Sequence, residues 1–335
     1  MNSVGRVFRV SVAGESHGPA IAVLIDGCPP GVPLTVGEFA ADLARRRGGR
    51  PGTTARVEED VPEILSGLFN GRTTGSPLLM LFRNRDVQPG AYDDLVHTPR
   101  PGHADWTAWF RSGGFNDPRG GGHFSGRLTV AVVAAGVVAK KLIAPAEVQA
   151  HLIEAGGSTD IDTSVERARA DGDSIGGLIE CRASGVPPGL GEPFFDSLES
   201  LISHAVFAVP AVKGIEFGAG FAAARMRGSV MNDVILDVSG RTASNHAGGI
   251  NGGLSNGNEI VFRVAVKPAS SIAKPQRTVD LETGNAVEIR IGGRHDACIA
   301  LRVPVVIEAA TAIVLADAQR IADHSAQRAG AQEGH

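Results

Sequence analysis

The spacing of apolar residues along the chain predicts a mixture of strands and helices. Residues 7–12 and 21–25 are short, apolar and rich in Val and Ile, which is typical of strands. Residues 63–69 and 78–82 predict a pair of strands, with the Asn-Gly dipeptide at 70–71 beginning the turn between them. Four more strands are predicted, at 177–183, 215–218, 234–238 and 260–266.

Three segments predict helices. Thr35 is followed three residues later by Glu38, a capping-box pattern that predicts a helix over 36–46. Residues 127–143 and 305–322 are rich in Ala and Val and largely apolar. A helix that is apolar on most sides belongs in a protein interior, so we expect two buried helices there.

Composition favours one globular unit. A chain of 335 residues that is 43% hydrophobic and 20% charged can bury a large core. Its 44 glycines are well above the average usage of about 7%, and they cluster at 113–122 and 248–257 beside polar residues. Such clusters allow close approach of the backbone to a ligand. We therefore expect a single domain over 1–323, followed by a polar, disordered tail over 324–335.

The sequence also argues against several broad classes of protein. The longest apolar stretch, 130–139, is too short to span a bilayer. No signal-peptide pattern precedes the first predicted strand, so a cytoplasmic protein is expected. The three cysteines are scattered, which offers neither a disulfide framework nor a paired metal-ligand spacing. A net charge of −4 leaves no general nucleic-acid footprint.

Basic residues are nevertheless concentrated locally. Most of them are arginines, and a group lies just before and within a loop that reads GGRPGTT at 48–54. Glycine and proline end the predicted helix there, and guanidinium groups suit phosphate and carboxylate. The pattern therefore indicates either an ordinary solvated helix end or an anion-binding loop, and it comprises Arg45, Arg46, Arg47, Arg50 and Arg56.

Three histidines lie in glycine-marked loops beside an acid or a hydroxyl. His17 lies in GESHG, His103 in RPGHAD and His295 in GRHD. Glycine or proline lets the backbone turn sharply near a ligand, and histidine exchanges a proton near neutral pH. Because these loops are spread along the whole chain, they predict one catalytic site assembled from distant segments.

Other familiar sites fit less well. GESHG matches the Gly-x-Ser-x-Gly nucleophile pattern literally, but Pro19 and an extended segment follow where that elbow needs a helix. A metal site built from His17, His103 and Asp296 has no local i, i+4 pair of ligands. Neither a Gly-x-Gly-x-x-Gly fingerprint after a strand nor a P-loop occurs. A Ser16 nucleophile and a metal site are therefore the weaker alternatives.

A series of short motifs runs along nearly the whole chain. In order they are GESHG (14–18), DGCPPG (26–31), EILSG (63–67), RPGHAD (100–105), GDSIGG (172–177), PAVKG (210–214), SNHAGG (244–249), KPASSI (267–272) and RHD (294–296). Each motif is weak alone. Together and in this order they are specific, and over 8–317 the chain resembles the chorismate synthase family.

The resemblance implies a carbon-oxygen lyase of the shikimate pathway of aromatic amino-acid biosynthesis. Its reaction converts 5-enolpyruvylshikimate 3-phosphate to chorismate and phosphate by anti-1,4-elimination, and needs reduced FMN without net redox change. It also implies an α+β fold, a β-α-β sandwich with helices packed between antiparallel sheets, assembled as a homotetramer. With no added reductase domain, reduced FMN is expected from an external flavin reductase. No nucleic-acid or membrane partner is expected.

The resemblance also implies residue roles. His17 lies near the departing phosphate, His103 gives a proton to the reduced flavin, and Asp296 removes a ring proton together with the flavin N5. The substrate-binding residues that it implies are Ser16, Arg46, Arg47, Arg127 and Arg294. The flavin-binding residues that it implies are His123, Phe124, Ser125, Pro210, Ala211, Gly252, Lys267, Pro268, Ala269, Ser270, Ser271 and Arg294.

Two segments depart from the family pattern. After its triple glycine the chain reads HFSGRLT at 123–129, where many members read RSSARET. The arginine loop is one residue shorter than RRRPGQSR and lacks the final arginine, for which Arg50 is the candidate replacement. Substrate affinity and any nicotinamide binding by this loop depend on that replacement. A flavin-binding paralogue that has lost the elimination is therefore the second hypothesis.

Overall fold

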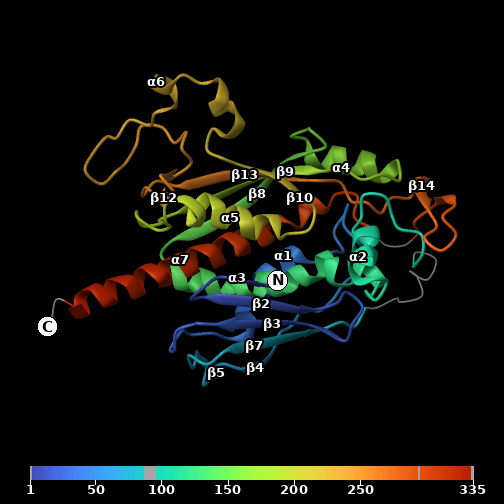
Figure 1. Cartoon of the computed structure of the whole chain (residues 1–335), viewed down its shortest axis with the longest axis horizontal. Helices are drawn as coiled ribbons and strands as arrows, with labels where there is room; N and C mark the ends of the chain where they lie inside the picture. Colours follow the sequence, from blue (N-terminus) through green and yellow to red (C-terminus); the bar gives the residue numbers. More distant parts are fainter. Residues whose placement is uncertain (1, 87–95, 293–294, 333–335) are drawn as a thin grey trace.

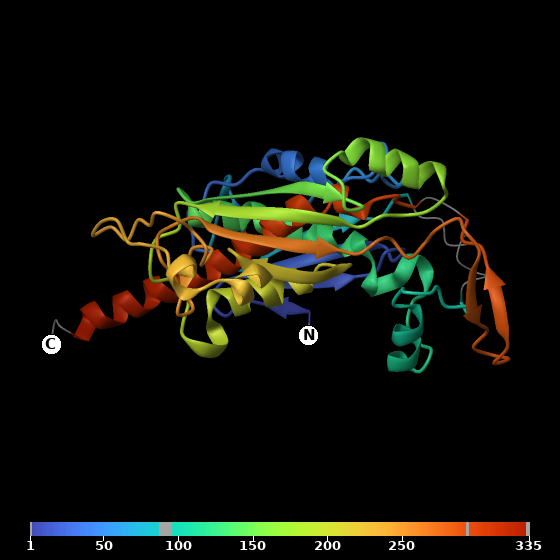
Figure 2. The same cartoon turned by 90° about the horizontal axis from the view of Figure 1, so that it is seen from above.

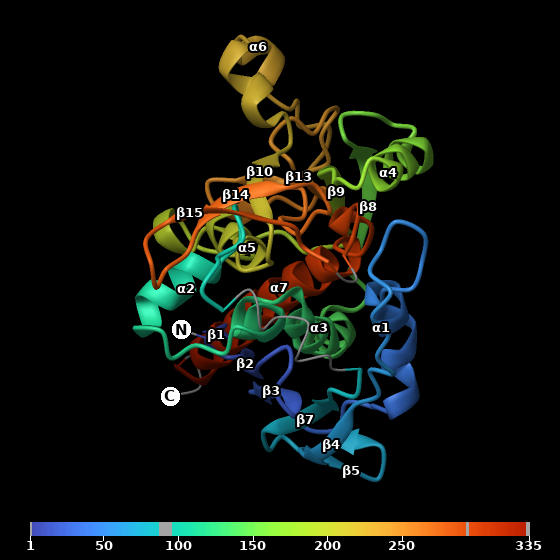
Figure 3. The same cartoon turned by 90° about the vertical axis from the view of Figure 1, so that its right-hand side faces the viewer.

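Two antiparallel sheets enclose a layer of helices (Figure 1). The computed structural model describes residues 2–86, 96–292 and 295–332. The blue sheet at the bottom of Figure 1 comes from the first part of the chain, and the green-to-orange sheet above it from the second part. Helices α3 (Thr129–Ile143) and α7 (Pro304–Gln332) lie between the sheets (Figure 3). The predicted β-α-β sandwich is confirmed.

The first sheet has the strand order β1-β2-β3-β7-β4. Buried and exposed side chains alternate along residues 21–25, which shows which face of the sheet is turned toward the core. Ile21, Val23 and Ile25 are buried, whereas the intervening Leu24 is 38% exposed. The predicted strands at 7–12 and 21–25 correspond to β2 and β3. The strand bounds are β1 (Ser3–Val4), β2 (Arg9–Gly14), β3 (Ala20–Asp26), β4 (Glu63–Ser66) and β7 (Leu78–Arg83).

The second sheet has the strand order β10-β13-β9-β8 and is also antiparallel. Phe262 and Val264 point to the core, where Phe262 pairs in register with the buried Cys181 of the neighbouring strand. The predicted strands at 177–183, 215–218 and 260–266 are confirmed. The strand bounds are β8 (Glu147–Ala155), β9 (Gly177–Ser184), β10 (Val212–Phe217) and β13 (Ile260–Val266).

The predicted helices are also found. The capping box at the start of the first helix is present, with the Thr35 N–H donating to the Glu38 carboxylate over 2.6 Å. The remaining α-helices are α1 (Ala40–Arg46), α2 (Asp105–Ser112), α4 (Ile161–Ala170), α5 (Leu198–Phe207) and α6 (Gly228–Met231). The 3-10 turns are η1 (Val36–Phe39), η3 (Arg119–Phe124), η4 (Gly126–Leu128), η5 (Phe194–Asp196), η6 (Gly220–Arg225) and η7 (Ile299–Leu301).

Small hairpins project from the sandwich. In Figure 2 the β14–β15 hairpin and α2 extend from one end of the molecule, and the last turns of α7 extend from the other. Among the described residues, no helix is both long and apolar enough to cross a membrane. The hairpin strands are β5 (Leu68–Phe69), β6 (Arg72–Thr73), β11 (Ile250–Asn251), β12 (Leu254–Ser255), β14 (Gln276–Val279) and β15 (Ala286–Ile289).

Two predictions about local structure were wrong, and one was confirmed in part. Residues 234–238 form no strand but an arm with a single bridge between Ile235 and Thr242, and Val238 is fully exposed. This arm lies beside α6, away from the sheets (Figure 3). The predicted pairing of 63–69 with 78–82 is confirmed, since β4 pairs with β7, but the Asn-Gly turn at 70–71 joins the short strands β5 and β6 that lie between them in sequence. The segment 324–332, expected to be disordered, continues α7, since it is rich in alanine, the best helix former.

The helix layer depends on the close approach of α3 to α7. A Cβ atom at Gly136 would lie 2.3 Å from the Ala309 Cβ and 2.6 Å from its Cα, closer than real side chains pack. Only glycine fits there, since the clash is with the backbone of α7 as well as its side chain.

We predict that Gly136→Val destabilises the protein by about 1–3 kcal/mol or more, because the added methyls force the two central helices apart. The measurement is chemical unfolding followed by circular dichroism. The control is Gly37→Ala, since a Cβ at Gly37 meets no atom within 4 Å and the residue has an ordinary φ. An unchanged midpoint in Gly136→Val would contradict the packing argument.

Candidate active site

A cavity of about 1060 Å³ lies where the edge of the first sheet, the turns before α3 and the loop after β13 meet. Protein ligand pockets are commonly about 300–1,000 Å³, so this one has room for more than one small molecule. Among the described lining residues eight are arginine or lysine, and they are Arg46, Arg47, Arg56, Arg100, Arg127, Lys213, Lys267 and Arg302. The acidic side chains among the described lining residues are Glu58 and Asp296.

A buried aspartate behind the wall joins two of these arginines. The Asp60 carboxylate accepts hydrogen bonds from Nη2 of Arg46 and Nη1 of Arg127, and its side chain has no exposed surface. Burial alone would raise the pKa of Asp60, but the two guanidinium groups outweigh burial and hold the pKa below its ordinary value. Burial lowers the pKa of Arg46 to about 10, so this guanidinium stays charged near neutral pH.

The same arginines still have unused donors. Nε of Arg46, Nε of Arg47 and Nη2 of Arg127 are buried and have no hydrogen-bond partner among the described residues. A buried donor without an acceptor costs about 1–3 kcal/mol. Such atoms at a cavity rich in positive charge are what an anion-binding site needs, because a bound anion supplies acceptors.

The helix that carries Arg46 is fastened by a second buried carboxylate. Glu308 of α7 accepts two hydrogen bonds from Arg45 (2.7 and 2.6 Å), one from Lys140 of α3 (2.9 Å) and one from the Ala150 N–H of β8 (2.9 Å). Burial would raise the pKa of Glu308, but these donors together hold the pKa below its ordinary value. Three elements, α7, α3 and β8, therefore fix the end of α1, where Arg46 enters the cavity.

The predicted His17 loop lies at the wall. Its backbone is tied to the glycine turn η3, since the Ser16 N–H donates to the Gly122 carbonyl over 3.0 Å. Ser16 lines the cavity, whereas His17 is packed one layer behind it, against Gly120. A Cβ at Gly120 would lie 2.4 Å from the His17 ring, so only glycine allows this contact. Burial and the Arg56 charge lower the pKa of His17 below 6.5.

Arg56 holds the Ser16 side of this loop. Its Nη1 donates to the Ser16 hydroxyl over 2.9 Å, and its Nη2 donates to the Ser16 carbonyl over 3.0 Å and to the Glu58 carboxylate over 2.7 Å. Arg50, the candidate replacement for the missing family arginine, instead donates to the Arg45 carbonyl over 2.8 Å and is exposed. Arg56 lines the cavity, and Arg50 is not among the described lining residues.

His103 is fixed by an acid and an arginine. Its Nδ1 lies 2.5 Å from Asp105 Oδ1 and 3.0 Å from Arg100 Nη2. Because Arg100 can only donate and the ionised Asp105 can only accept, the shorter contact assigns the Nδ1 proton to the bond with Asp105. The pKa of Asp105 is held well below its ordinary value, since bonds from Arg100 and His103 outweigh its burial. The Nε2 edge of His103 lies against the buried Gly121, and His103 itself lines the cavity.

Asp296 lines the cavity and is held on both oxygens. Arg302 donates from Nε to Oδ1 over 2.9 Å and from Nη2 to Oδ2 over 2.7 Å, and the Thr54 N–H donates to Oδ1 over 3.0 Å. The short turn η7 separates the two residues and brings their side chains together. His295 also lines the cavity, and burial lowers its pKa. Arg294 lies outside the described residues.

The predicted flavin segments line the other side of the cavity. Lys267 Nζ donates over 2.7 Å to both the Gly102 carbonyl and the Ser270 hydroxyl, and it has no carboxylate partner in the described part of the chain. Burial, followed by the nearby Lys213, lowers the pKa of Lys267. Other predicted residues on this lining are His123, Phe124, Ser125, Pro210, Ala211, Pro268, Ala269, Ser270 and Ser271. Gly252 lies in the β11–β12 turn and is absent from the described lining.

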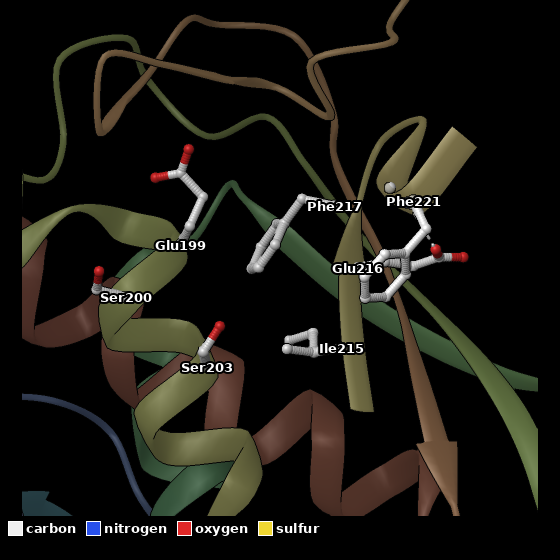
Figure 4. Close-up of a pocket in the computed structure, with 8 residues that line it drawn as sticks. Glu199, Ser200, Ser203, Ile215, Glu216, Phe217 and Phe221 are labelled. Atoms are coloured by element: carbon white, nitrogen blue, oxygen red, sulfur yellow. Dashed lines mark hydrogen bonds between the residues drawn. The ribbon is translucent and has the colours of Figure 1, made fainter. Parts of the chain in front are cut away.

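A second hollow lies between α5 and β10 (Figure 4). Its volume is about 440 Å³, and its lining includes Glu199, Glu216, Phe217 and Phe221. The described lining of this hollow holds two carboxylates and no basic side chain, so it is unsuited to a multiply charged anion. No group of three metal-binding side chains occurs within residues 2–86, 96–292 and 295–332.

Sequence reasoning missed three functional candidates in the cavity region, which are Asp60, Arg100 and Arg302, whereas Arg56 belonged to the predicted arginine cluster. Asp60 ends the segment RVEED at 56–60, where three acidic residues follow Arg56. That acidic run was the available signal for Asp60, because it places negative charges beside the arginines of a predicted anion site.

The fold and the cavity together define an enzyme that binds a multiply anionic ligand with positioned histidines beside it. The family model described as chorismate synthase matches residues 8–319. A chorismate synthase of Chitinophaga pinensis is 58% identical over 318 residues, covering 95% of this chain and 96% of that one. One of Korarchaeum cryptofilum is 45% identical over 345 residues, covering 93% and 96%.

A solved structure agrees with this match. The crystal structure of a chorismate synthase superposes with a TM-score of 0.72 at 29% identity, covering 94% of this chain and 92% of that one. The chain therefore belongs to the chorismate synthase family. Its reaction is that family's carbon-oxygen lyase reaction, the elimination of phosphate to give chorismate.

We predict that Asp60→Asn destabilises the fold by about 3–5 kcal/mol, because two buried guanidinium groups lose their shared counter-charge. Asn keeps the shape of the side chain and tolerates the left-handed backbone at this residue, where φ is 54°. The free energy of unfolding in urea is the measurement.

The matched control is Glu63→Gln, which breaks an exposed ion pair with Arg83 and should change the free energy of unfolding little. Equal effects of the two variants would show that Asp60 does not carry the buried charge balance.

Proposed function

We propose that this cavity binds 5-enolpyruvylshikimate 3-phosphate beside reduced FMN and that Ser16, His17, His103 and Asp296 act in the elimination. The observation that carries the proposal is the set of unpartnered guanidinium donors on Arg46, Arg47 and Arg127 at a cavity with surplus positive charge. The substrate has a phosphate and two carboxylates, so its charge complements this lining.

Substrate binding is assigned to the arginines that Asp60 positions. Arg46 and Arg127 each use one nitrogen on Asp60, which leaves other N–H groups of their planar forks for an anion. Arg47 joins them from the end of α1. Because these side chains are held before substrate arrives, little ordering is required on binding. Arg294 is kept as a proposed contact on the strength of its motif alone.

Departure of the phosphate is assigned to the Ser16–His17 loop. His17 is neutral near pH 7, since burial and Arg56 lower its pKa. A phosphate nearby favours the charged imidazolium, so His17 can take up a proton as the substrate binds and stabilise the leaving group. Ser16 lines the cavity and can bond to the substrate directly.

Proton removal from the substrate ring is assigned to Asp296. Arg302 and the Thr54 N–H hold this carboxylate in one orientation at the cavity wall. His103 is oriented by Asp105 and lines the cavity, where its imidazole can hold a proton for the cofactor side of the site. Asp296 and His103 are assigned to different proton transfers because they lie on different segments of the cavity lining.

The lining also fits a flavin phosphate. Lys267 is a half-buried ammonium with no carboxylate partner among the described residues, the Ser270 hydroxyl accepts a hydrogen bond from it, and Ser271 follows in the same loop. These groups would hold FMN, together with backbone at Pro210 and Ala211. When bound, reduced FMN supplies electron density that assists the loss of phosphate without net redox change.

The oligomeric state, the cellular compartment and the source of reduced FMN are also proposals. We infer a homotetramer in the cytoplasm that receives reduced FMN from a separate reductase. Exposed apolar side chains between residues 221 and 238 support assembly, since Phe221, Ile235 and Val238 are largely exposed within their own chain. Sedimentation analysis measures the oligomeric state.

One anaerobic assay tests the proposed function. Chemically reduced FMN and substrate are added to the protein, and phosphate release is followed together with chorismate absorbance. Turnover supports the enzyme. Tight flavin binding without turnover would instead support a flavin-binding paralogue, the hypothesis that the short arginine loop keeps open.

We predict that His17→Ala and Asp296→Asn each lower turnover by about 10²-fold or more while flavin still binds, because each removes a proton-transferring group. Matched controls are His151→Ala and Asp171→Asn, two exposed residues away from the cavity lining. Full turnover in both site variants would refute the assigned roles.

A further inference from the structure

We propose that Arg56 is a positioning residue that makes the Ser16 hydroxyl a hydrogen-bond donor to the substrate phosphate. The inference rests on the proposed function of this site. The loop before Arg56 is shorter than in the family pattern and lacks its final arginine, and Arg56 lies ten residues beyond the predicted helix end at residue 46.

The direction of the hydrogen bonds carries the argument. A guanidinium has only donors, so the Ser16 Oγ must accept the 2.9 Å bond from Arg56 Nη1. The hydroxyl proton of Ser16 then points elsewhere, and Ser16 lines the cavity while its residue is 1% exposed. The bond from Nη2 to the Ser16 carbonyl fixes the backbone of the same residue. A rigid O–H donor beside a basic cavity selects an anion.

Glu58 keeps Arg56 in this geometry. It accepts from Nη2 over 2.7 Å and from Nε over 3.2 Å, and it also accepts from the Arg85 N–H over 2.9 Å. Burial would raise the pKa of Glu58, but these donors hold the pKa below its ordinary value. The ion pair is therefore present across the neutral range, and the Arg56 side chain is only 16% exposed.

The same guanidinium acts on His17. In the described part of the chain, the charged groups that face this imidazole are Arg56 from the segment after the arginine loop, and Arg119 and Asp117 from the segment at η3. Burial has the largest effect, followed by Arg56, and both lower the pKa of His17, whereas Asp117 raises it. Loss of the Arg56 charge would therefore raise the pKa of His17.

The test uses the full chain without flavin and then with reduced FMN. Histidine-labelled protein is titrated by NMR, and the His17 signal is identified as the one missing in His17→Gln. Arg56→Met should raise the His17 midpoint, whereas Arg56→Lys keeps the charge and should leave it low. With reduced FMN, Arg56→Met should lower kcat/KM by about 10–100-fold, mostly through KM, since a charge-assisted contact is lost.

Double variants separate positioning from general damage. If Arg56 acts through Ser16, Arg56→Met should cost little more in the Ser16→Ala background, because the contact is already gone. Arg56→Met combined with Glu58→Gln removes both charges of the pair, which keeps the test usable if a lone buried Glu58 impairs folding. Arg85→Met, which breaks an exposed pair with Glu59, is the matched control and should change neither readout.

An unchanged His17 midpoint in Arg56→Met, or fully additive losses with Ser16→Ala, would overturn the inference. Full turnover in His17→Ala, with the His17 midpoint shift of Arg56→Met still present, would overturn the proposed function and not this inference. The two failures are thus distinguishable.

Discussion

The shared carboxylate of Asp60 is the contact on which the site depends. Its two oxygens join Arg46 at the end of α1 to Arg127 in the turn before α3. The two sides of the cavity are therefore fixed by one buried carboxylate. Two guanidinium groups this deep would repel each other without it. Because Asp60 supplies one negative charge for two positive ones, a surplus remains, and that surplus is what the cavity offers to a substrate.

The same arrangement recurs around the wall. Arg56 has Glu58, Arg100 has Asp105 and Arg302 has Asp296, so these guanidinium groups are oriented before any ligand is present. Pairing with a carboxylate lowers the free-energy cost of burying each guanidinium group. Only the positive charges that exceed the number of paired carboxylates are left to attract anions. A chain with a net charge of −4 can thereby present a basic cavity. The position of charged side chains around the cavity determines anion binding, and the net charge of the chain does not.

Much of the fold could be predicted because buried strands and helices follow simple periodicities. The strands near residues 21–25 and 260–266 and the helix over 127–143 all bury regular apolar faces. The arm at 234–238 misled prediction because its apolar residues alternate as in a strand but find no sheet within the chain. The site was predicted through its histidine motifs. Asp60 and Arg302 were missed because a counter-ion is recognised only when folding brings it to its partner.

The state of His17 changes how loss of phosphate is understood. A histidine near a leaving phosphate suggests an imidazolium acid, yet burial and Arg56 favour the neutral ring in the free protein. Under the proposed function, the positive charge that meets the substrate first comes from arginines, whose charge does not vary near neutral pH. In that proposal the proton on His17 arrives with the phosphate, since the anion itself raises the proton affinity of the ring. The proposed order confines the acid to the bound complex, where the leaving group needs it.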